Sequence, residues 1–241
     1  NEKALLEAKQ EKLRANLLRS ISHDLRTPLT SISGNASVLL KDFDSLDNNK
    51  KHELYEDMYD DSMWLINLVE NLLSVTRIEG GSMNLNIEHE LLSEVIGEAL
   101  KHINRKSVEH NIKVENNDEL IMAKMDSRLI MQVIINIVDN AIKYTPEGSD
   151  ITIKVNKKNG YVYTSIIDNG KGISDEGKKN LFKMFYTGGN IADSRRGLGL
   201  GLYLCKTIVN AHGGELMVKD NTPKGTIFTF SLKAQEVTLH E

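Results

Sequence analysis

Cysteines and long hydrophobic runs are scarce in this 241-residue sequence. No apolar stretch reaches the roughly 18 residues of a membrane-spanning helix, and no signal peptide is recognisable. The single cysteine, Cys205, excludes an internal disulfide framework and indicates a reducing compartment. Because Cys205 lies within an apolar helical pattern, we expect a packed residue rather than a nucleophile. The chain begins with Asn1 instead of Met, so we expect a soluble cytoplasmic fragment of a longer protein.

The common nucleotide-binding loops and a strongly basic charge are also missing. The sequence has no Gly-x4-Gly-Lys-Ser/Thr loop and no Gly-x-Gly-x-x-Gly after a predicted strand, which disfavours the P-loop and dinucleotide folds. A net charge of −4 argues against nucleic acid as the main partner.

Residues 21–30, with the sequence ISHDLRTPLT, place an exposed histidine on a predicted amphipathic helix. The apolar residues of this helix recur at four-residue steps: Leu13, Leu17, Ile21 and Leu25. At about 100° per residue, His23 lies roughly opposite this stripe and faces water, with Thr27 on the same face and Asp24 beside it. Pro28 removes a backbone donor inside the helix, which costs ~3 kcal/mol of helix stability. This predicts a kink suited to movement.

A single helical histidine usually has no chemical role, and this is the simplest interpretation of His23 by itself. The neighbouring carboxylate favours another interpretation. Asp24 can keep one ring nitrogen protonated, so that the other attacks an electrophile. His23 is therefore a candidate nucleophile, provided that a nucleotide site exists elsewhere in the chain.

The first third of the sequence predicts two long helices. Residues 1–20 contain no Gly or Pro and continue the His23 helix toward the N-terminus. A polar segment at 41–51 separates it from a second predicted helix. That helix ends at the Gly-Gly pair of residues 80–81. A hairpin of this kind cannot bury both apolar stripes alone, so we expect a homodimer with a four-helix bundle.

Short strands alternate with helices in the remainder of the chain. Helices are expected at 91–106, 127–144 and 201–211, and strands at 112–115, 121–124, 151–155, 161–167, 215–219 and 226–232. Asn159-Gly160 is typical of a hairpin turn, and residues 222–225 predict another turn. The order indicates an α+β fold with an α/β sandwich. We expect a dimerisation hairpin at 1–80, a linker at 81–87, a sandwich domain at 88–234 and a tail at 235–241.

Two groups of residues suit a nucleotide. Gly197, Gly199 and Gly201 alternate at a helix start, where backbone N–H groups and the helix dipole favour a triphosphate. On the 127–144 helix, Asn140 and Lys143 lie together with Asn136 along one flank. Amide oxygens suit Mg²⁺ that also keeps waters and phosphate oxygens, and lysine suits phosphate.

Five segments, and a sixth that completes the set, together resemble a known family. Residues 22–29, SHDLRTPL, resemble the phosphoacceptor box of bacterial sensor histidine kinases. The later segments resemble the ATP-binding sandwich shared by histidine kinases, Hsp90, gyrase and MutL: 136–144 (the N box), 168–172 (the G1 box), 182–186 (the F box) and 197–202, completed by 225–228. The aromatic residues of 182–186 equally suit simple packing under a loop.

The resemblance implies ATP and Mg²⁺ as cofactors, with Mg²⁺ on Asn140. Asp168 would accept a hydrogen bond from the adenine amino group, while Gly170 and Gly172 let the backbone approach the base. Other implied nucleotide-binding residues are Asn136, Lys143, Tyr144, Arg196, Gly197, Gly199, Gly201 and Thr226. Residues 189–196 would form a lid. Leu198 stands where the family commonly has Thr, which removes a hydroxyl contact but leaves the backbone contacts.

The implied activity is ATP-dependent autophosphorylation of His23, followed by transfer to an aspartate of a response regulator receiver domain. Asp24 would act as general base, and Thr27 would help to place a water that dephosphorylates the regulator. Segments 30–34 and 192–199 resemble the KdpD-like sensor kinases more narrowly. A full-length bacterial protein of this kind would be tethered to the membrane through a region missing here.

Three alternatives remain. ATP-hydrolysing members of the same fold carry a Glu four residues before the magnesium Asn; Asn136 occupies that position, which favours transfer over hydrolysis. A dimeric ATP-binding scaffold without catalysis is disfavoured because all boxes are intact. A Ser/Thr kinase on this fold would not need the helix around His23 and Pro28.

Overall fold

The computed structural model describes residues 2–79, 84–115, 120–187 and 199–235. These residues form two compact units, which divide after Thr76.

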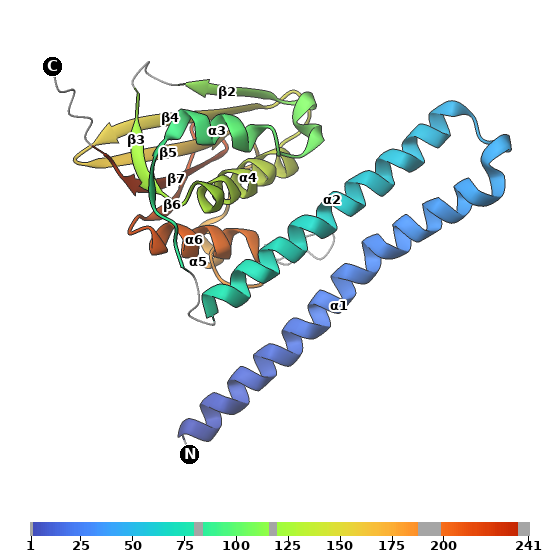
Figure 1. The fold of residues 1–241 in the computed structure, drawn as a ribbon, viewed down its shortest axis with the longest axis horizontal. Helices are drawn as coiled ribbons and strands as arrows, with labels where there is room; N and C mark the ends of the chain where they lie inside the picture. The colour runs from blue at the N-terminus through green and yellow to red at the C-terminus, as the bar shows by residue number, and fades with distance from the viewer. Residues whose placement is uncertain (1, 80–83, 116–119, 188–198, 236–241) are drawn as a thin grey trace. The chain divides into compact units, whose positions relative to one another are not determined.

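The first unit is a helical hairpin. Helix α1 covers Glu2–Asp42, a short 3-10 turn η1 covers Phe43–Ser45, and helix α2 covers Asn48–Glu79 (Figure 1). Helix α1 passes through Pro28 with its helical backbone unbroken, so the expected kink does not interrupt the helix.

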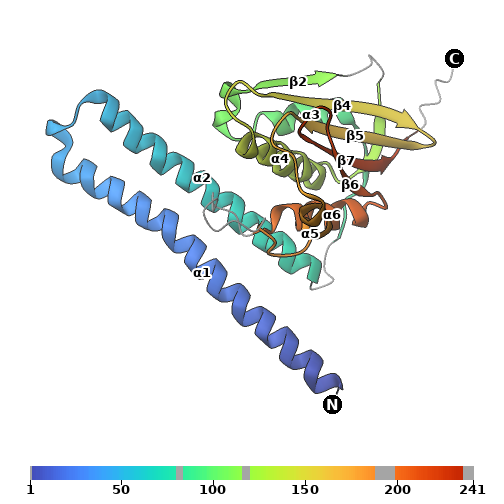
Figure 2. The same ribbon diagram turned by 180° about the vertical axis from the view of Figure 1, so that it is seen from behind.

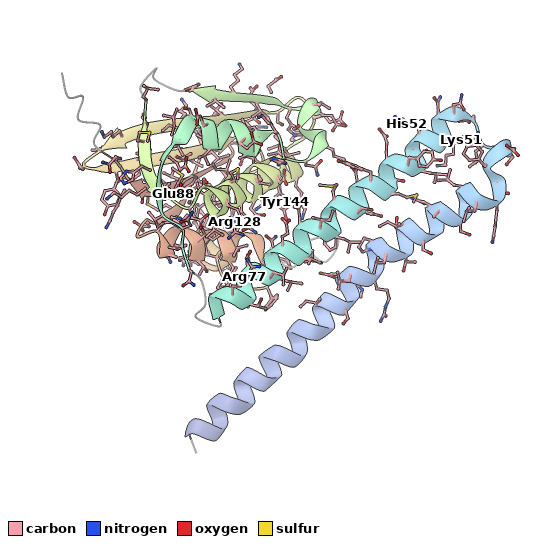
Figure 3. The ribbon with its side chains drawn as sticks, in the orientation of Figure 1. Lys51, His52, Arg77, Glu88, Arg128 and Tyr144 are labelled. Carbon is pink, nitrogen blue, oxygen red and sulfur yellow. The ribbon has the colours of Figure 1, made fainter. Side chains whose placement is uncertain are left out.

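The connection between the two helices is shorter than the polar composition of 41–51 suggests. Helix α2 already begins at Asn48, because the Asp47 carboxylate accepts a hydrogen bond from the Lys50 backbone N–H at 2.7 Å and satisfies a free donor of the first turn. The Lys51 ammonium, labelled in Figure 3, lies 4.1 Å from the centre of the Phe43 ring and packs the turn against the start of α2.

The hairpin leaves much apolar surface uncovered. On α2, large apolar side chains that are roughly half exposed recur at helical spacing: Tyr55, Tyr59, Ile66, Val69 and Leu73. Their spacing places them along one stripe of the helix. Contiguous apolar patches of this kind mark interaction surfaces, so this stripe, called here the α2 stripe, is a candidate dimer interface.

The second unit is an α/β sandwich. Its helices are α3 (Leu92–Leu100), η2 (Arg105–Glu109), α4 (Ser127–Tyr144), α5 (Asp175–Asn180) and α6 (Gly201–Ala211). Its strands are β1 (Glu88–Leu91), β2 (Asn111–Glu115), β3 (Met122–Met125), β4 (Asp150–Lys158), β5 (Tyr161–Asp168), β6 (Leu216–Asp220) and β7 (Thr226–Lys233). This architecture confirms the expected α+β fold.

Five strands form the main sheet in the order β2-β4-β5-β7-β6, and β1 pairs with β3 separately. Only the β2–β4 pair of the main sheet is parallel. Alternate residues of β5, Val162, Thr164 and Ile166, are fully buried. Helices α4 and α6 pack side by side and contact the sheet, as both views show (Figures 1 and 2). The core therefore lies between one helical layer and one sheet.

Elements with a strong periodic pattern have the expected bounds, notably α4 and α6. The hairpin turn is also confirmed, since Asn159 and Gly160 have φ angles of 52° and 75°. The helix expected at 91–106 was wrong in length. It ends at Leu100, and the Asn104 side chain then accepts the Lys106 N–H at 2.9 Å and starts η2. Strand β1 and helix α5 were not expected.

Candidate functional site

The phosphoacceptor candidate His23 is exposed on α1. Its side chain is 79% accessible, and its Nδ1 lies 3.0 Å from the Asp24 carboxylate. A carboxylate in this position holds the tautomer with the proton on Nδ1, which leaves the lone pair of Nε2 for attack. The expected exposure of His23 and its contact with Asp24 are therefore both present.

Thr27 lies one turn after His23 on the same helix. Its hydroxyl donates a hydrogen bond to the His23 backbone carbonyl at 3.3 Å. Both residues are exposed, as their shared helical face predicts. His23, Asp24 and Thr27 belong to the hairpin, whereas all the described candidate nucleotide-binding residues belong to the sandwich unit.

Helix α4 carries the first group of nucleotide-binding candidates. Its N-terminus is fixed by Asp126, whose side chain accepts the Leu129 N–H at 3.3 Å. Figure 3 labels Arg128 and Tyr144 at the two ends of this helix. The candidates on its flank are partly accessible: Asn136, Asn140 and Lys143. Tyr144 is 49% exposed, and the Lys143 ammonium lies 5.0 Å from the centre of its ring.

The side-chain amide of Asn136 includes a buried hydrogen-bond donor that is unsatisfied among the described residues. Its Nδ2 makes no hydrogen bond to any described residue, and its side-chain neighbour is the thiol of Cys205, a weak acceptor. The Asn136 amide also lies at the start of α6, since a Cβ on Gly201 would be 3.6 Å from its Oδ1. An unpaired buried N–H beside a helix N-terminus suits an anionic oxygen.

The amide oxygen of Asn140 is the donor that would hold Mg²⁺ bound together with the phosphates of a nucleotide. Within the described ranges, no cluster of three or more His, Cys, Asp or Glu residues could hold a metal ion. Asn140 offers one hard amide oxygen, and Mg²⁺ typically takes one or two protein oxygens together with phosphate oxygens and waters.

Asp168 ends β5 and is only 8% exposed. Its Oδ1 accepts the backbone N–H of Gly170 at 2.8 Å and that of Thr226 at 3.2 Å. Burial raises the pKa of this carboxyl group, and the two N–H donors oppose that shift. Close approach favours glycine at residue 170, because a Cβ there would lie 3.0 Å from Asp168 Oδ1 and 3.1 Å from the Tyr144 carbonyl oxygen. The end of β5, the start of β7 and the end of α4 thus meet at Asp168.

The described part of the glycine-rich segment lies beside Asn136 at the start of α6. Gly199 has a φ of 64°, and Gly201 begins the helix beside Asn136. Gly172, with a φ of 78°, lies on the loop after Asp168. Arg196 and Gly197, with Leu198 and the expected lid at 189–196, lie outside the described residues.

The aromatic segment 182–186 packs as its simpler interpretation predicts. The rings of Phe182 and Phe228 meet edge to face with centres 6.5 Å apart. The Lys206 ammonium lies 5.1 Å from the centre of the Phe182 ring. This segment therefore joins α6 to β7.

Two residues near the site were not expected from the sequence. Asp139 accepts the Asn104 N–H at 2.8 Å, and burial raises its pKa to about 6. Asn221, between β6 and β7, donates through its Nδ2 to the Asp168 backbone carbonyl at 2.8 Å. Both contacts join segments far apart in the sequence, which no local pattern predicts.

Family comparisons agree with both units. A family model for the His Kinase A (phospho-acceptor) domain matches residues 13–81. A second, for the histidine kinase-, DNA gyrase B-, and HSP90-like ATPase, matches residues 125–236. Among the described residues, no helix has the length and apolarity to cross a membrane.

Individual proteins are similar along nearly the whole chain. The sensor protein KdpD of Clostridium acetobutylicum is 47% identical over 96% of this chain and 26% of that protein. The sensor protein KdpD of Escherichia coli strain K12 is 32% identical over 97% of the chain and 26% of that protein. The solved complex of histidine kinase ThkA with response regulator protein TrrA has a TM-score of 0.64 and 25% identity, over 95% of this chain and 64% of that one.

The chain belongs to the sensor histidine kinases, since it carries the phosphoacceptor and ATPase domains of that family in order. It spans about a quarter of the length of the curated relatives just described. Within the family it is of the KdpD-like type, to whose members it has 47% and 32% identity.

Proposed function

We propose that this chain is a kinase core that uses ATP to phosphorylate His23 and then transfers the phosphoryl group to an aspartate of a response regulator. The observation that carries the proposal is the exposed imidazole of His23 with the Asp24 carboxylate 3.0 Å from Nδ1. It is supported by the family assignment and by the ThkA–TrrA complex, in which a related kinase core binds a response regulator.

In the proposed reaction, the Nε2 lone pair of His23 attacks the γ-phosphorus of ATP. The new N–P bond forms as the bond to the bridging oxygen of the ADP leaving group breaks. Asp24 takes the proton from Nδ1, so the phosphorylated imidazole is neutral. Phosphoryl transfer depends mainly on positioning and charge neutralisation.

Asn136, Asn140 and Lys143 would bind the phosphates together with the backbone of Gly197, Gly199 and Gly201, and Arg196 would supply a further positive charge. Mg²⁺ on Asn140 would neutralise phosphate charge. Asp168 would accept a hydrogen bond from the adenine amino group, between Gly170, Gly172 and Thr226, and Tyr144 would lie beside the base. Thr27 would help to place a water for dephosphorylation of the regulator.

The test is incorporation of label from γ-labelled ATP into His23→Gln. The matched control is His52→Gln (His52 is labelled in Figure 3), because His52 is also on a helix, is 77% exposed, and lies 3.3 Å from Glu56. We expect no acid-labile label in His23→Gln and normal labelling in His52→Gln. Acid-labile label that persists without His23 would refute the assignment.

We further propose a homodimer that buries the α2 stripe in a four-helix bundle. Ile66→Glu combined with Leu73→Glu places charges on two residues that are each 50% exposed, so the folded hairpin tolerates them but the dimer does not. The mass in solution should fall from dimer to monomer, while Lys51→Glu at the far end of the hairpin should leave the dimer intact. A monomeric wild-type chain would contradict this proposal.

The division into a hairpin at 1–80, a linker at 81–87 and a sandwich domain at 88–234, with a tail at 235–241, is likewise a proposal. So is the cytoplasmic location of this core in a longer protein that is tethered to the membrane through another region. Limited proteolysis that cuts within 81–87 and releases two folded fragments would support the division.

A further inference from the structure

The turn between β6 and β7, residues 221–225 and called here the β6–β7 turn, holds the end of β5 at several atoms. Asn221 Nδ2 donates to the Asp168 backbone carbonyl at 2.8 Å. The Asn221 backbone N–H donates to the Gly225 carbonyl at 3.0 Å and closes the turn. The Thr226 N–H, directly after the turn, donates to Asp168 Oδ1 at 3.2 Å. One short segment therefore binds both the main chain and the side chain of Asp168.

The Asn221 amide binds Asp168 on the side where the pairing of β5 with β7 has ended, while the other side of β5 still pairs Asp168 with Ile151 of β4. Pairing of β5 with β7 stops at Ile167 opposite Ile227, so Asp168 has no partner residue in β7. Without the Asn221 side chain, the Asp168 carbonyl would lose the hydrogen bond that fixes the last peptide of β5. Gly225, with a φ of 117°, lets the turn approach this closely, because a Cβ there would collide with the Asp168 carbonyl oxygen.

A second contact fixes the other end of the loop that follows Asp168. The Lys178 ammonium on α5 contacts Asp220, the last residue of β6, at 2.6 Å and Asp175 at 3.0 Å. The loop at 169–174 is therefore held near β6 and β7 at both of its ends. A loop fixed in this way presents the Asp168 carboxylate in one orientation.

The two carboxylate oxygens of Asp168 are not equivalent. Oδ1 already accepts the N–H groups of Gly170 and Thr226. In the part of the chain that the structure describes, Oδ2 receives no hydrogen bond. Oδ2 is thus the oxygen that remains for a donor on a ligand.

We propose that Asn221 is a positioning residue for purine recognition: by holding the Asp168 main chain, it directs Oδ2 toward the exocyclic amino group of the adenine ring. This inference rests on the proposed ATP-binding function and adds a specificity determinant to it. Asn221 touches no nucleotide and acts through Asp168 alone. Its removal should therefore affect the recognition of the amino group and leave the binding of the phosphates unchanged.

The experiment compares the affinities of ATP and purine riboside triphosphate, which lacks the 6-amino group, for the full chain with Mg²⁺ by calorimetry. Asn221→Asp is nearly isosteric but replaces the donor with a charged acceptor that faces the Asp168 carbonyl oxygen. Asn221→Ala is the second variant, because it removes the donor without adding a charge. Lys224→Gln is the matched control, because Lys224 is an exposed residue of the same turn. Thermal unfolding of each variant checks that the sandwich domain is intact.

We expect Asn221→Asp to weaken ATP binding about tenfold, the effect of losing one hydrogen bond to a charged group, and to change the affinity for the analogue less than twofold. In an Asp168→Asn background, Asn221→Asp should cause no further loss. Equal weakening of both nucleotides, or an unchanged preference for ATP, would overturn the positioning role alone. A wild-type chain that binds neither nucleotide would instead overturn the proposed function.

Discussion

The imidazole of His212 joins the end of α6 to the start of α4, because its Nε2 accepts the backbone N–H of Asp126 at 3.0 Å. Its Nδ1 lies 2.7 Å from the Ile208 carbonyl, which can only accept, so the proton is assigned to Nδ1 and the ring is neutral. Asp126 in turn caps α4 through Leu129. The two helices that carry the candidate phosphate-binding residues are therefore fixed to each other at one buried contact.

Replacement of His212 with Leu should destabilise the sandwich domain by about 2–4 kcal/mol, because it leaves the buried Asp126 N–H without its acceptor. The Ile208 carbonyl keeps the backbone N–H of residue 212 as a donor. Chemical denaturation followed by circular dichroism measures this loss. His102→Ala is the control, because that histidine follows the end of α3 and its 61% exposed side chain lies 3.3 Å from the Glu98 carboxylate. A loss below about 0.5 kcal/mol in His212→Leu would show that the contact contributes little.

Stability should depend on pH through Asp139. Burial raises the pKa of its carboxyl group from 3.8 to about 6, so the folded chain binds a proton more tightly than the unfolded chain. Folding stability therefore falls as the pH rises from about 4 to about 6 and stays lower above that range. Asp139→Asn keeps an acceptor for the Asn104 N–H and should increase stability at pH 8 by about 1–3 kcal/mol.

The same substitution should have almost no effect at pH 4, where the wild-type carboxyl group is already protonated in the fold. Urea denaturation at both pH values tests this difference. Glu147→Gln, at an exposed position after α4, controls for the loss of one negative charge. An equal effect of Asp139→Asn at both pH values would contradict the linkage.

The sequence predicts what depends on local periodicity and fails where distant segments meet. Helices α4 and α6 were predicted because their apolar residues recur at helical spacing, and the exposure of His23 follows from the same geometry. Strand β1, with the sequence EHEL, is short and largely polar, and it exists because it pairs with β3. Its stability comes from a partner more than 30 residues away, which no window of sequence contains.

The residues of the candidate site also fall into two groups, those that the local sequence pattern predicts and those that only the fold reveals. The flank formed by Asn136, Asn140 and Lys143 could be placed from the helical period alone. Asn221 could not, because it looks like an ordinary turn residue until the fold brings it to the Asp168 carbonyl. Asp139 shares a helix with the predicted residues, but its hydrogen-bond donor is the backbone N–H of Asn104, which follows another helix.

The single thiol should be inert in the folded chain. Cys205 is fully buried, and burial raises its pKa to about 12, so the thiolate that reacts with alkylating reagents is almost absent. We expect no labelling by iodoacetamide at pH 8 under native conditions and complete labelling in guanidinium chloride. Rapid native labelling would show that α6 opens readily from the core.

Thr164 carries a hydroxyl that the core does not use. It is fully buried on β5, and its Oγ1 has no hydrogen-bond partner among the described residues. Thr164→Val replaces the hydroxyl with a methyl group of similar size and should stabilise the fold by about 1 kcal/mol. Thr229→Val is the control, because the Thr229 hydroxyl is hydrogen-bonded to Ser165 at 2.8 Å and its loss should not stabilise. Destabilisation of Thr164→Val would indicate an unrecognised partner.

Gly199 should be irreplaceable for reasons of packing as well as phosphate binding. A Cβ at this position would lie 2.5 Å from the Tyr186 carbonyl oxygen and 2.7 Å from its nitrogen, both of which are main-chain atoms that cannot turn aside. Its φ of 64° adds strain for any L side chain. Gly199→Ala should therefore displace the start of α6 from Tyr186 and break the hydrogen bond from the Phe185 N–H to the Gly199 carbonyl.

We expect Gly199→Ala to lose at least ~2 kcal/mol of stability, or to stay folded with ATP binding weakened at least tenfold because Gly201 moves away from Asn136. Gly97→Ala is a matched glycine control: Gly97 lies in α3, a Cβ there meets nothing within 4 Å, and alanine favours a helix. Gly97→Ala should stabilise by up to about 1 kcal/mol and leave ATP binding unchanged. If both variants behave alike, the requirement for glycine at residue 199 comes from neither the clash with Tyr186 nor the positive φ.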